Sequence, residues 1–423
     1  MYPRSKKTTV IAYLIYLALA IAVVENIFFL ILRLQHQLIF SRSVPDYDAV
    51  YRFDRRREGG HLLPNQNGWM KGERLDHPVR IITNSKGFRN DREFEYAVPA
   101  HTFRILFLGD SYVDGMRTDQ TRTIGYLLEQ ALNKNEKVDG INAYEVMISS
   151  HSDPADAWYY YQEFGFRYHP QLILLGVTIG NDLTRHGYRS SLWPETDANG
   201  NRVLTLKKSD GQHTEKESWF PEEAYVPEQK ISLLNRTQCR VREWVHNIFP
   251  LWAGYLVPAS YWYTDPPFDT RRHVQMQSMT TSLGLAYRPV PAEIEKQYVN
   301  FEEVLDGFAS AAKHRGSGLA IVLFPTRLQS SEKEWQLFVK FYSINPSKFD
   351  LKYPDRRIGE FCRKRGIPCL DLLPAFEEHY RQSNKPLYRP HGDMHFNEDG
   401  QALAAREIHP FIKKFLPDKK IAA

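Results

Sequence analysis

Five short and almost continuously apolar segments alternate with helical patterns, and this alternation is the strongest constraint on the fold. The segments are "RILFLG" (104–109), "YEVMIS" (144–149), "QLILLGV" (171–177), "GLAIVLFP" (318–325) and "IPCLDL" (367–372). Apolar runs of this length are typical of parallel strands that are buried on both faces. Residues 293–314 carry apolar side chains at spacings of three or four, which indicates an amphipathic helix. The pattern predicts an α/β fold, a three-layer α/β/α sandwich with a doubly wound, flavodoxin-like parallel sheet.

The chain of 423 residues is long enough for more than one domain, or for one domain with insertions. We expect one α/β domain over residues 103–417, with an insertion at about 185–290, where the alternation stops. Within it, "DANGNRV" (197–203) predicts a hairpin turn. The aromatic-rich stretch 248–268 is interpreted as packing, and the alternatives are a lid, an acyl or sugar platform, or a surface that rests on a membrane.

The N-terminal part of the chain contains a long, largely apolar stretch. Residues 10–32, "VIAYLIYLALAIAVVENIFFLIL", are broken only by Glu25 and Asn26 and would form a helix of roughly 34 Å, enough to cross a bilayer. Basic residues in the tail 1–9 favour a cytoplasmic tail and an extracytoplasmic domain on a single-pass anchor in the cell membrane. A cleavable signal peptide and a buried core helix are the alternatives. Residues 33–102 are polar and rich in arginine, and we interpret them as a tether and edge segment.

Composition excludes few functions. The net charge of +5 is small, and basic residues neither cluster nor form a recognisable motif, so we expect no nucleic-acid partner. The three cysteines, Cys239, Cys362 and Cys369, make no disulfide framework and no zinc spacing. Cys362 and Cys369 could pair outside the cytoplasm or remain as two buried thiols. We expect no cofactor and no metal, and nothing in the sequence indicates an oligomeric state.

Polar residues follow three of the apolar segments, in positions that suit nucleophilic catalysis. "FLGDSYVDG" (107–115) presents Ser111 directly after the first strand. Serine needs a base, a group that orients the base, and donors for an oxyanion. Near the C-terminus, "HGDMHFNEDG" (391–400) places Asp393 and His395 two residues apart, and "TIGNDL" (178–183) places Asn181 after the third strand. We expect His395 to take the proton of Ser111, Asp393 to hold the imidazole tautomer, and Asn181 to donate to the oxyanion.

In these motifs the chain resembles the SGNH hydrolases, also called GDSL-type lipases and esterases, over roughly residues 103–417. The resemblance rests on Gly109-Asp110-Ser111, on Gly180-Asn181-Asp182 and on Asp393-Met394-His395, in that order. It implies a Ser111–His395–Asp393 triad, with the backbone N–H of Ser111 and the side chain of Asn181 in the oxyanion hole. The implied function is that of a membrane-anchored serine esterase. It would act through an acyl-enzyme on O-acyl groups of a cell-surface carbohydrate or lipid.

One departure from the family pattern concerns the third oxyanion donor. The family carries a glycine after the second strand, whereas this chain reads "MISSHSDPADAW" (147–158), with Ser150 or His151 at the nearest position. A backbone N–H survives this replacement, but a side chain now projects there.

Three alternative functions remain open. The same triad could transfer an acyl group to an extracytoplasmic polysaccharide. His391, Asp393 and His395 could bind a metal ion, although that would leave Ser111 and Asn181 unexplained. The domain could also be a catalytically silent anchored scaffold.

Overall fold

A computed structural model describes residues 60–70, 79–136, 138–185, 192–196, 202–206, 283–342, 345–383, 385–389 and 394–417, with a few single positions between 13 and 27. No helix among these described residues is long and apolar enough to cross a membrane. Most of the predicted anchor 10–32, Cys239 and the aromatic stretch 248–268 lie outside the described residues.

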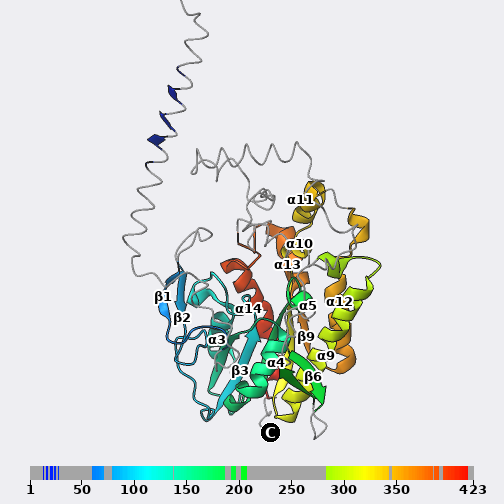
Figure 1. Cartoon of the computed structure of the whole chain (residues 1–423). Helices are drawn as coiled ribbons and strands as arrows, with labels where there is room; N and C mark the ends of the chain where they lie inside the picture. Colours follow the sequence, from blue (N-terminus) through cyan, green and yellow to red (C-terminus); the bar gives the residue numbers. More distant parts are fainter. Residues whose placement is uncertain are drawn as a thin grey trace, which may run out of the picture.

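The five predicted strands form one parallel sheet. They are β3 (Thr102–Gly109), β4 (Ala143–Ser150), β5 (Leu172–Thr178), β8 (Gly318–Phe324) and β9 (Cys369–Asp371). Their spatial order is β4-β3-β5-β8-β9, and every neighbouring pair is parallel (Figure 1). Numbered along the chain, this order is 2-1-3-4-5, in which the direction of winding reverses between β3 and β5. Ligands bind at the carboxyl ends of the strands at such a reversal.

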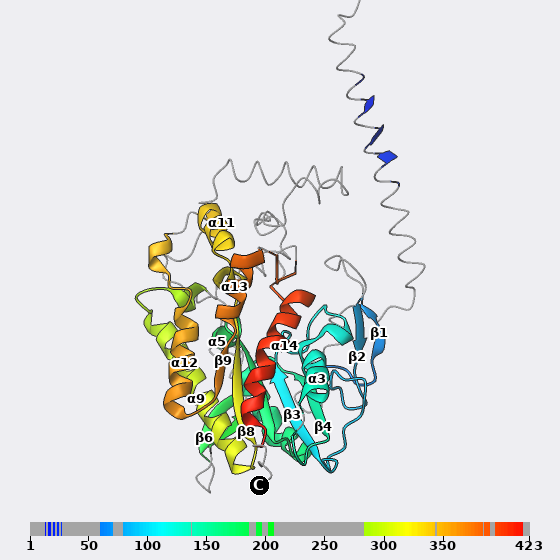
Figure 2. The same ribbon diagram turned by 180° about the vertical axis from the view of Figure 1, so that it is seen from behind.

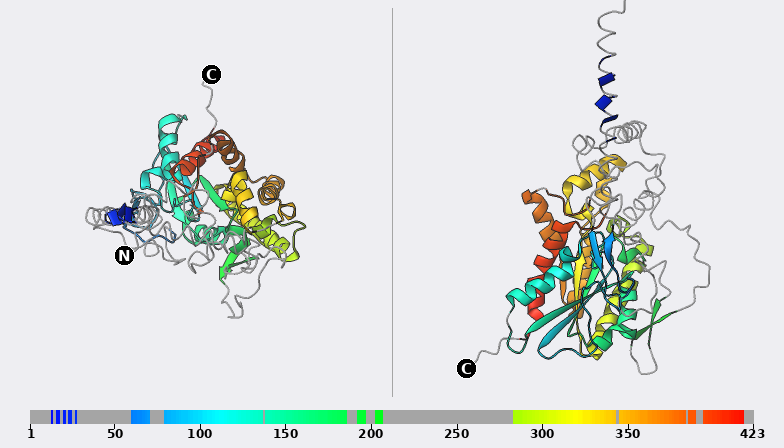
Figure 3. Two further views of the ribbon diagram at one scale, coloured as in Figure 1. Left: turned by 90° about the horizontal axis from the view of Figure 1, so that it is seen from above. Right: turned by 90° about the vertical axis from the view of Figure 1, so that its left-hand side faces the viewer.

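Two layers of helices cover the sheet, and each buries an apolar cluster against it. On one face, β3 and β5 pack against α4 (Pro154–Glu163), α9 (Ala292–His314) and α12 (Tyr353–Arg365). On the other face they pack against α3 (Ile124–Asn135), α13 (Leu373–Ser383) and α14 (Glu398–Ile412). Figures 1 and 2 show these two layers from the front and from behind, and the view from above in Figure 3 places the red α14 beside the cyan α3. The predicted helix 293–314 is α9.

The remaining elements are short. The described residues contain α5 (Asp182–Arg185), α10 (Arg327–Ser330), α11 (Glu332–Tyr342), η1 (Gln120–Arg122), η2 (Gly165–Tyr168), η5 (Pro346–Lys348) and η6 (Lys413–Phe415). Two antiparallel pairs lie outside the main sheet: β1 (Asn67–Met70) with β2 (Val79–Ile82), and β6 (Leu192–Thr196) with β7 (Arg202–Leu206). The pairing of β6 with β7 bears out the predicted hairpin, whose turn lies outside the described residues.

The segment before β3, which the sequence suggested to be a tether and edge structure, packs on the domain where it is described. We call residues 60–70 and 79–101 the edge segment. Gly60 forms a parallel bridge with Ser150 at the end of β4, the outermost strand of the sheet. Phe88 and Val79 are fully buried. The edge segment therefore covers part of an otherwise open sheet edge and reaches the carboxyl ends of the strands.

Cys362 and Cys369 are free thiols. Cys362 is buried in α12, and Cys369 is half-buried in the neighbouring β9.

Candidate active site

The turn after β3 carries Ser111 at the carboxyl end of the sheet. β3 ends at Gly109, where any Cβ would lie 2.4 Å from Val113 Cγ2 and 2.9 Å from the carbonyl oxygen of Gly176 on β5. Only glycine therefore fits there, since both neighbours are buried and one is backbone. The turn is closed by hydrogen bonds from the N–H groups of Val113 and Asp114 to the carbonyl oxygen of Asp110.

Ser111 and His395 are 284 residues apart in the chain and meet at this edge. His395 Nε2 lies 2.7 Å from Ser111 Oγ. This is the distance of a hydrogen bond between a nucleophile and its general base. Both side chains are partly buried. The serine hydroxyl can donate to a neutral imidazole, which is the arrangement required for proton removal.

The loop before α14 holds His395 through contacts on both sides. The N–H of Arg389 donates to the carbonyl oxygen of His395 at 2.9 Å, and the hydroxyl of Tyr112 donates to the carbonyl oxygen of Met394. The rings of Tyr112 and His395 are 5.3 Å apart. Asn397 caps α14 by accepting from the N–H of Gly400. The loop is thus fastened to α14 and to the turn after β3 that carries Ser111, which we call the nucleophile turn.

The environment of His395 keeps its imidazole neutral. Burial and the positive charge of Arg117 lower the pKa of His395 to about 4, against the opposing effect of Asp110 and Asp114. A neutral ring that carries its proton on Nδ1 presents the lone pair of Nε2 to Ser111. Asp393, which the sequence assigns as the group that orients the ring, lies outside the described residues, as do His186 and His391.

Asp110 links the nucleophile turn to the predicted oxyanion donor. Its Oδ1 accepts from the N–H of Tyr112 and from Thr178 Oγ1, each at 3.0 Å. Its Oδ2 accepts from Asn181 Nδ2 at 2.9 Å. The carboxylate is buried, so that these bonds fix the direction of the Asn181 amide. Asp110 therefore has a structural role, which is to hold the turn after β3 and the Asn181 amide in fixed positions.

Ser150 and His151, the two candidates for the third oxyanion donor, both make hydrogen bonds in the structure. The N–H of His151 donates to the carbonyl oxygen of Gly109 at 2.6 Å, within the sheet. The hydroxyl of Ser150 donates to Asp114 Oδ2 at 2.7 Å, and Ser150 is buried. The side chain of Ser150 is thus directed at the nucleophile turn and held there by Asp114.

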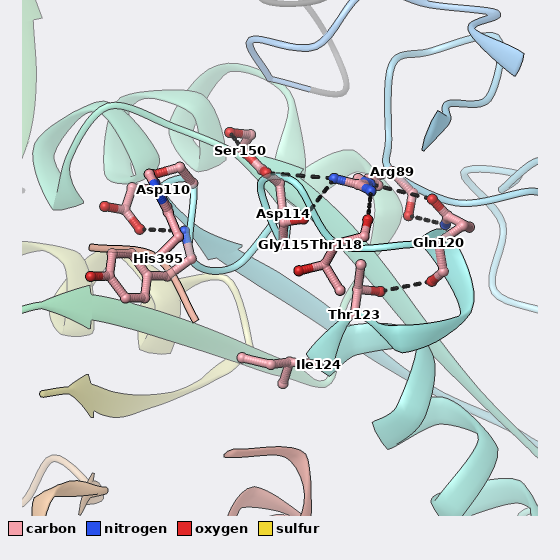
Figure 4. Close-up of polar contacts among 12 residues, drawn as sticks. Arg89, Asp110, Asp114, Gly115, Thr118, Gln120, Thr123, Ile124, Ser150 and His395 are labelled. Atoms are coloured by element: carbon pink, nitrogen blue, oxygen red, sulfur yellow. Dashed lines mark hydrogen bonds and ion pairs between the residues drawn. The ribbon is translucent and has the colours of Figure 1, made fainter. Parts of the chain in front are cut away.

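Arg89 of the edge segment supports the nucleophile turn and was not foreseen from the sequence. Figure 4 shows Ser150, Asp114 and Arg89 joined by dashed lines. Arg89 Nη1 lies 3.7 Å from Asp114 Oδ1 and donates to the carbonyl oxygen of Gly115 at 3.2 Å, while Nη2 donates to that of Thr118 at 2.7 Å. The arginine is buried. The only sign of this network in the sequence is Asp114, a second aspartate four residues after Asp110.

One group of side chains within the described residues lies close enough to hold a metal ion. It consists of His61, His151 and Asp156, and all three are buried. Burial lowers the pKa of His151, although Asp156 opposes this effect. None of these residues belongs to the metal site that the sequence offered as an alternative, in which His391 and Asp393 lie outside the described residues.

Comparisons with known proteins find no matching family profile and no similar sequence among curated proteins. Solved structures with a similar arrangement include a two-domain esterase active on acetylated mannans, at 9% identity and a TM-score of 0.36. That match covers 75% of this chain and 52% of the esterase, so the chain spans about half of its length. TesA matches at 8% identity and a TM-score of 0.35, covering 74% of this chain and 99% of TesA.

A catalytic mutant of an acetylxylan esterase from Geobacillus stearothermophilus is also similar, at 11% identity and a TM-score of 0.36. The match covers 75% of this chain and 97% of the esterase chain. Likeness at this level is too weak to assign a function, which must come from the geometry of the site.

Proposed function

We propose that the protein is a serine esterase of the SGNH hydrolase type that acts through an acyl-enzyme. The observation that carries this proposal is the 2.7 Å contact between Ser111 Oγ and His395 Nε2 at the carboxyl end of a parallel sheet. The lowered pKa of His395 keeps the ring neutral at neutral pH, in the form that a general base requires, and also makes it a weaker base than an ordinary histidine. The substrate class that we propose is an O-acyl group on a cell-surface carbohydrate or lipid.

The proposed reaction has two halves. His395 Nε2 takes the proton of Ser111 as Oγ bonds to the ester carbonyl carbon, and the imidazolium then gives that proton to the leaving alcohol. Water next loses a proton to His395 and attacks the acyl-enzyme, which releases the carboxylic acid and restores Ser111. The Ser111 N–H and the Asn181 side chain would stabilise the oxyanion in both halves. The side-chain NH₂ group of Asn181 carries two hydrogen atoms. One donates to Asp110, and this hydrogen bond sets the direction in which the second N–H points.

The test is labelling and turnover by the purified full chain. A fluorophosphonate should label the protein and fail on Ser111→Ala. Hydrolysis of a short-chain acyl ester should fall more than about 10³-fold in Ser111→Ala and in His395→Ala, and the double variant should be scarcely slower than either single variant. Ser383→Ala, which changes an exposed serine on α13, is the matched control and should keep full activity.

Two results would sort the remaining possibilities. A folded protein that hydrolyses the ester equally well after Ser111→Ala would overturn the proposal. A protein that is labelled at Ser111 but releases acid only slowly, and faster with a polysaccharide acceptor, would be a transferase that uses the same acyl-enzyme.

We also propose that the α/β domain lies outside the cytoplasm on an N-terminal anchor. The basic tail 1–9 and the apolar stretch 10–32 support this placement. Protease added to intact cells should digest the domain, and an active cytoplasm-only reporter fused after Ala423 would exclude the proposed topology.

A further inference from the structure

The buried group His61, His151 and Asp156 joins two distant parts of the chain. His61 belongs to the edge segment, His151 follows β4, and Asp156 lies in the first turn of α4. The exposed fractions of the three residues are 3%, 3% and 2%. The group plays no part in the proposed ester chemistry. Two of its members, His151 and Asp156, lie in the stretch 147–158, in which the chain departs from the SGNH family pattern.

Hydrogen bonding accounts for only part of this arrangement. His61 Nε2 is 2.8 Å from Asp156 Oδ2, which a single N–H donor explains. His151 Nδ1 faces the same oxygen at 3.8 Å, which is longer than a hydrogen bond. One ligand atom from each of the three residues lies within 4.8 Å of the other two. Ligands on a tetrahedral zinc ion at about 2.0–2.2 Å are separated by about 3.4 Å. His61 Nε2 and Asp156 Oδ2 would therefore move slightly apart, and His151 Nδ1 would move slightly closer to Asp156, for all three to bind one ion.

Asp156 Oδ2, the oxygen that faces both histidines, also accepts from the N–H of Ser152 at 3.1 Å. The outer ring nitrogen of His151 is held as in metal sites: Nε2 is 2.9 Å from Ser149 Oγ, which leaves Nδ1 as the nitrogen that faces Asp156. Metal-binding histidines almost always use their second ring nitrogen in this way, because it fixes the tautomer and the ring orientation.

We propose that His61 Nε2, His151 Nδ1 and Asp156 Oδ2 bind one divalent transition-metal ion, with zinc as the ion that fits best. Two imidazoles and one carboxylate suit zinc, whereas calcium and magnesium prefer sites made of oxygen atoms. Three protein ligands leave one position of a tetrahedral ion for water.

The ion would act as a clamp and not as the catalytic centre. Side chains alternate along β4, so Ser149 and His151 lie on one face of the sheet while Ser150 points to the other, toward Asp114 and the nucleophile turn. The backbone nevertheless connects the two faces. The N–H of His61 donates to the carbonyl oxygen of Ser150, and that of His151 donates to the carbonyl oxygen of Gly109. A bound ion would therefore fasten the edge segment to β4 just beneath the turn that carries Ser111.

The direct test is the metal content of the purified, untagged full chain. After incubation with zinc and removal of loose metal by a weak chelator, the wild type should retain about one zinc ion per chain and melt at a higher temperature than the metal-free protein. Asp156→Asn and His61→Gln, which preserve shape, should each weaken zinc binding by at least about 100-fold, and Ser149→Ala by about 10–100-fold. His169→Asn, at an exposed left-handed position, is the matched control and should bind as the wild type does.

Two further variants separate this site from the candidate active site. Ser111→Ala and His395→Ala should retain zinc with unchanged affinity, whatever happens to their esterase activity. Loss of zinc in His395→Ala together with full binding in Asp156→Asn would place the metal elsewhere and overturn the proposal. A wild type that retains no zinc and whose melting temperature zinc does not raise would overturn it as well.

X-ray absorption on the zinc-loaded wild type tests the proposal even if the ligand variants fail to fold. The expected spectrum shows about two imidazole ligands and only nitrogen and oxygen neighbours. A sulfur ligand, or a shell without imidazole, would exclude the site.

Discussion

The side-chain amide of Asn181 donates to Asp110 Oδ2 at 2.9 Å, which joins the residue before the candidate nucleophile to the candidate oxyanion donor. The two residues follow β3 and β5, the neighbouring strands between which the winding of the sheet reverses. Asp110 also accepts from the N–H of Tyr112 within the nucleophile turn. One carboxylate therefore sets the position of the turn and the direction of the donor together.

This relationship predicts that Asp110 and Asn181 act as a unit on the acyl-transfer step. Asn181→Ala should lower kcat for a short-chain ester by about 10²–10³-fold, as the loss of one oxyanion donor does. Asp110→Asn replaces one acceptor oxygen by an NH₂ group and should lower kcat by about 10–10²-fold through misplacement of the donor. The double variant should be little slower than Asn181→Ala alone, because residues in one network are not additive.

Steady-state kinetics on the four proteins of this cycle give the coupling directly. Asp182→Asn is the control, because Asp182 Oδ2 accepts from the backbone N–H of Thr178 and an asparagine oxygen can do the same. It should keep kcat within about threefold of the wild type. Strictly additive losses in the Asp110→Asn/Asn181→Ala variant would mean that Asp110 does not act through Asn181.

The fall of kcat/KM at acidic pH should report the protonation of His395. The ring must be neutral to accept the Ser111 proton, and burial together with Arg117 lowers its pKa to about 4. The value of kcat/KM should thus be flat from neutral pH down to about pH 5.5 and fall below about pH 4, where the ring becomes protonated. Arg117→Gln removes a nearby positive charge, so the pKa of His395 should rise and the acid limb should move toward neutral pH.

The pH profile needs a check that the protein remains folded, which circular dichroism at each pH provides. An acid limb centred near the ordinary histidine value of 6.5 in the wild type, or one that Arg117→Gln leaves in place, would contradict this account.

The parts of the fold that could be predicted are those in which residue type reports burial directly. All seven residues of β5 and six of the seven of β8 are buried, so continuous apolar runs identified these strands. The apolar stripe of α9 was equally clear. Ser111 and His395 could be paired across 284 residues because loops at the carboxyl ends of parallel strands meet at one edge.

The supporting residues could not be predicted, because their partners are set by the packing of the edge segment. Arg89 and His61 lie in a polar stretch without periodicity, and both are buried in the folded domain, where the edge segment packs beside β4. The sequence places a side chain at Ser150, and the structure adds its partner, Asp114, which no pattern in the sequence indicates. Contacts between such distant, locally irregular segments leave no pattern in the sequence.

Arg89 should be one of the most sensitive positions for stability. Arg89→Met leaves Asp114 buried without its cation, and the free energy of unfolding should fall by about 3–5 kcal/mol. Arg89→Lys should recover little, since one ammonium group cannot reach the carbonyl oxygens of Gly115 and Thr118 as the guanidinium does. Urea unfolding followed by fluorescence measures both changes.

Arg92, three residues further on, is the matched control for Arg89. It is 41% exposed and pairs with Glu129 at 2.6 Å at the surface. Arg92→Met should therefore cost less than about 1 kcal/mol. Adding Asp114→Asn to Arg89→Met should restore part of the lost stability, because the uncompensated charge is removed. A loss for Arg89→Met no greater than that for Arg92→Met would show that the buried network contributes little.

Two mid-helix glycines, Gly307 and Gly359, differ in what surrounds them. A Cβ at Gly307 in α9 would lie 2.2 Å from Trp158 Cη2, whereas one at Gly359 in α12 would meet nothing within 4 Å. Trp158 is fully buried and stacks on Phe308, so the indole has no room to move. Gly359→Ala should stabilise the protein by about 0.5–1 kcal/mol through helix propensity alone.

Gly307→Ala gains the same helix propensity but overpacks the interface of α9 with α4, which typically costs about 1–3 kcal/mol, so the net effect should be destabilising. Thermal and urea unfolding of both variants measures the difference. Adding Trp158→Phe should relieve the clash at Gly307 and bring the loss in the double variant close to that of Trp158→Phe alone. Equal stabilisation by Gly307→Ala and Gly359→Ala would mean that Gly307 and Trp158 are farther apart than in the structure.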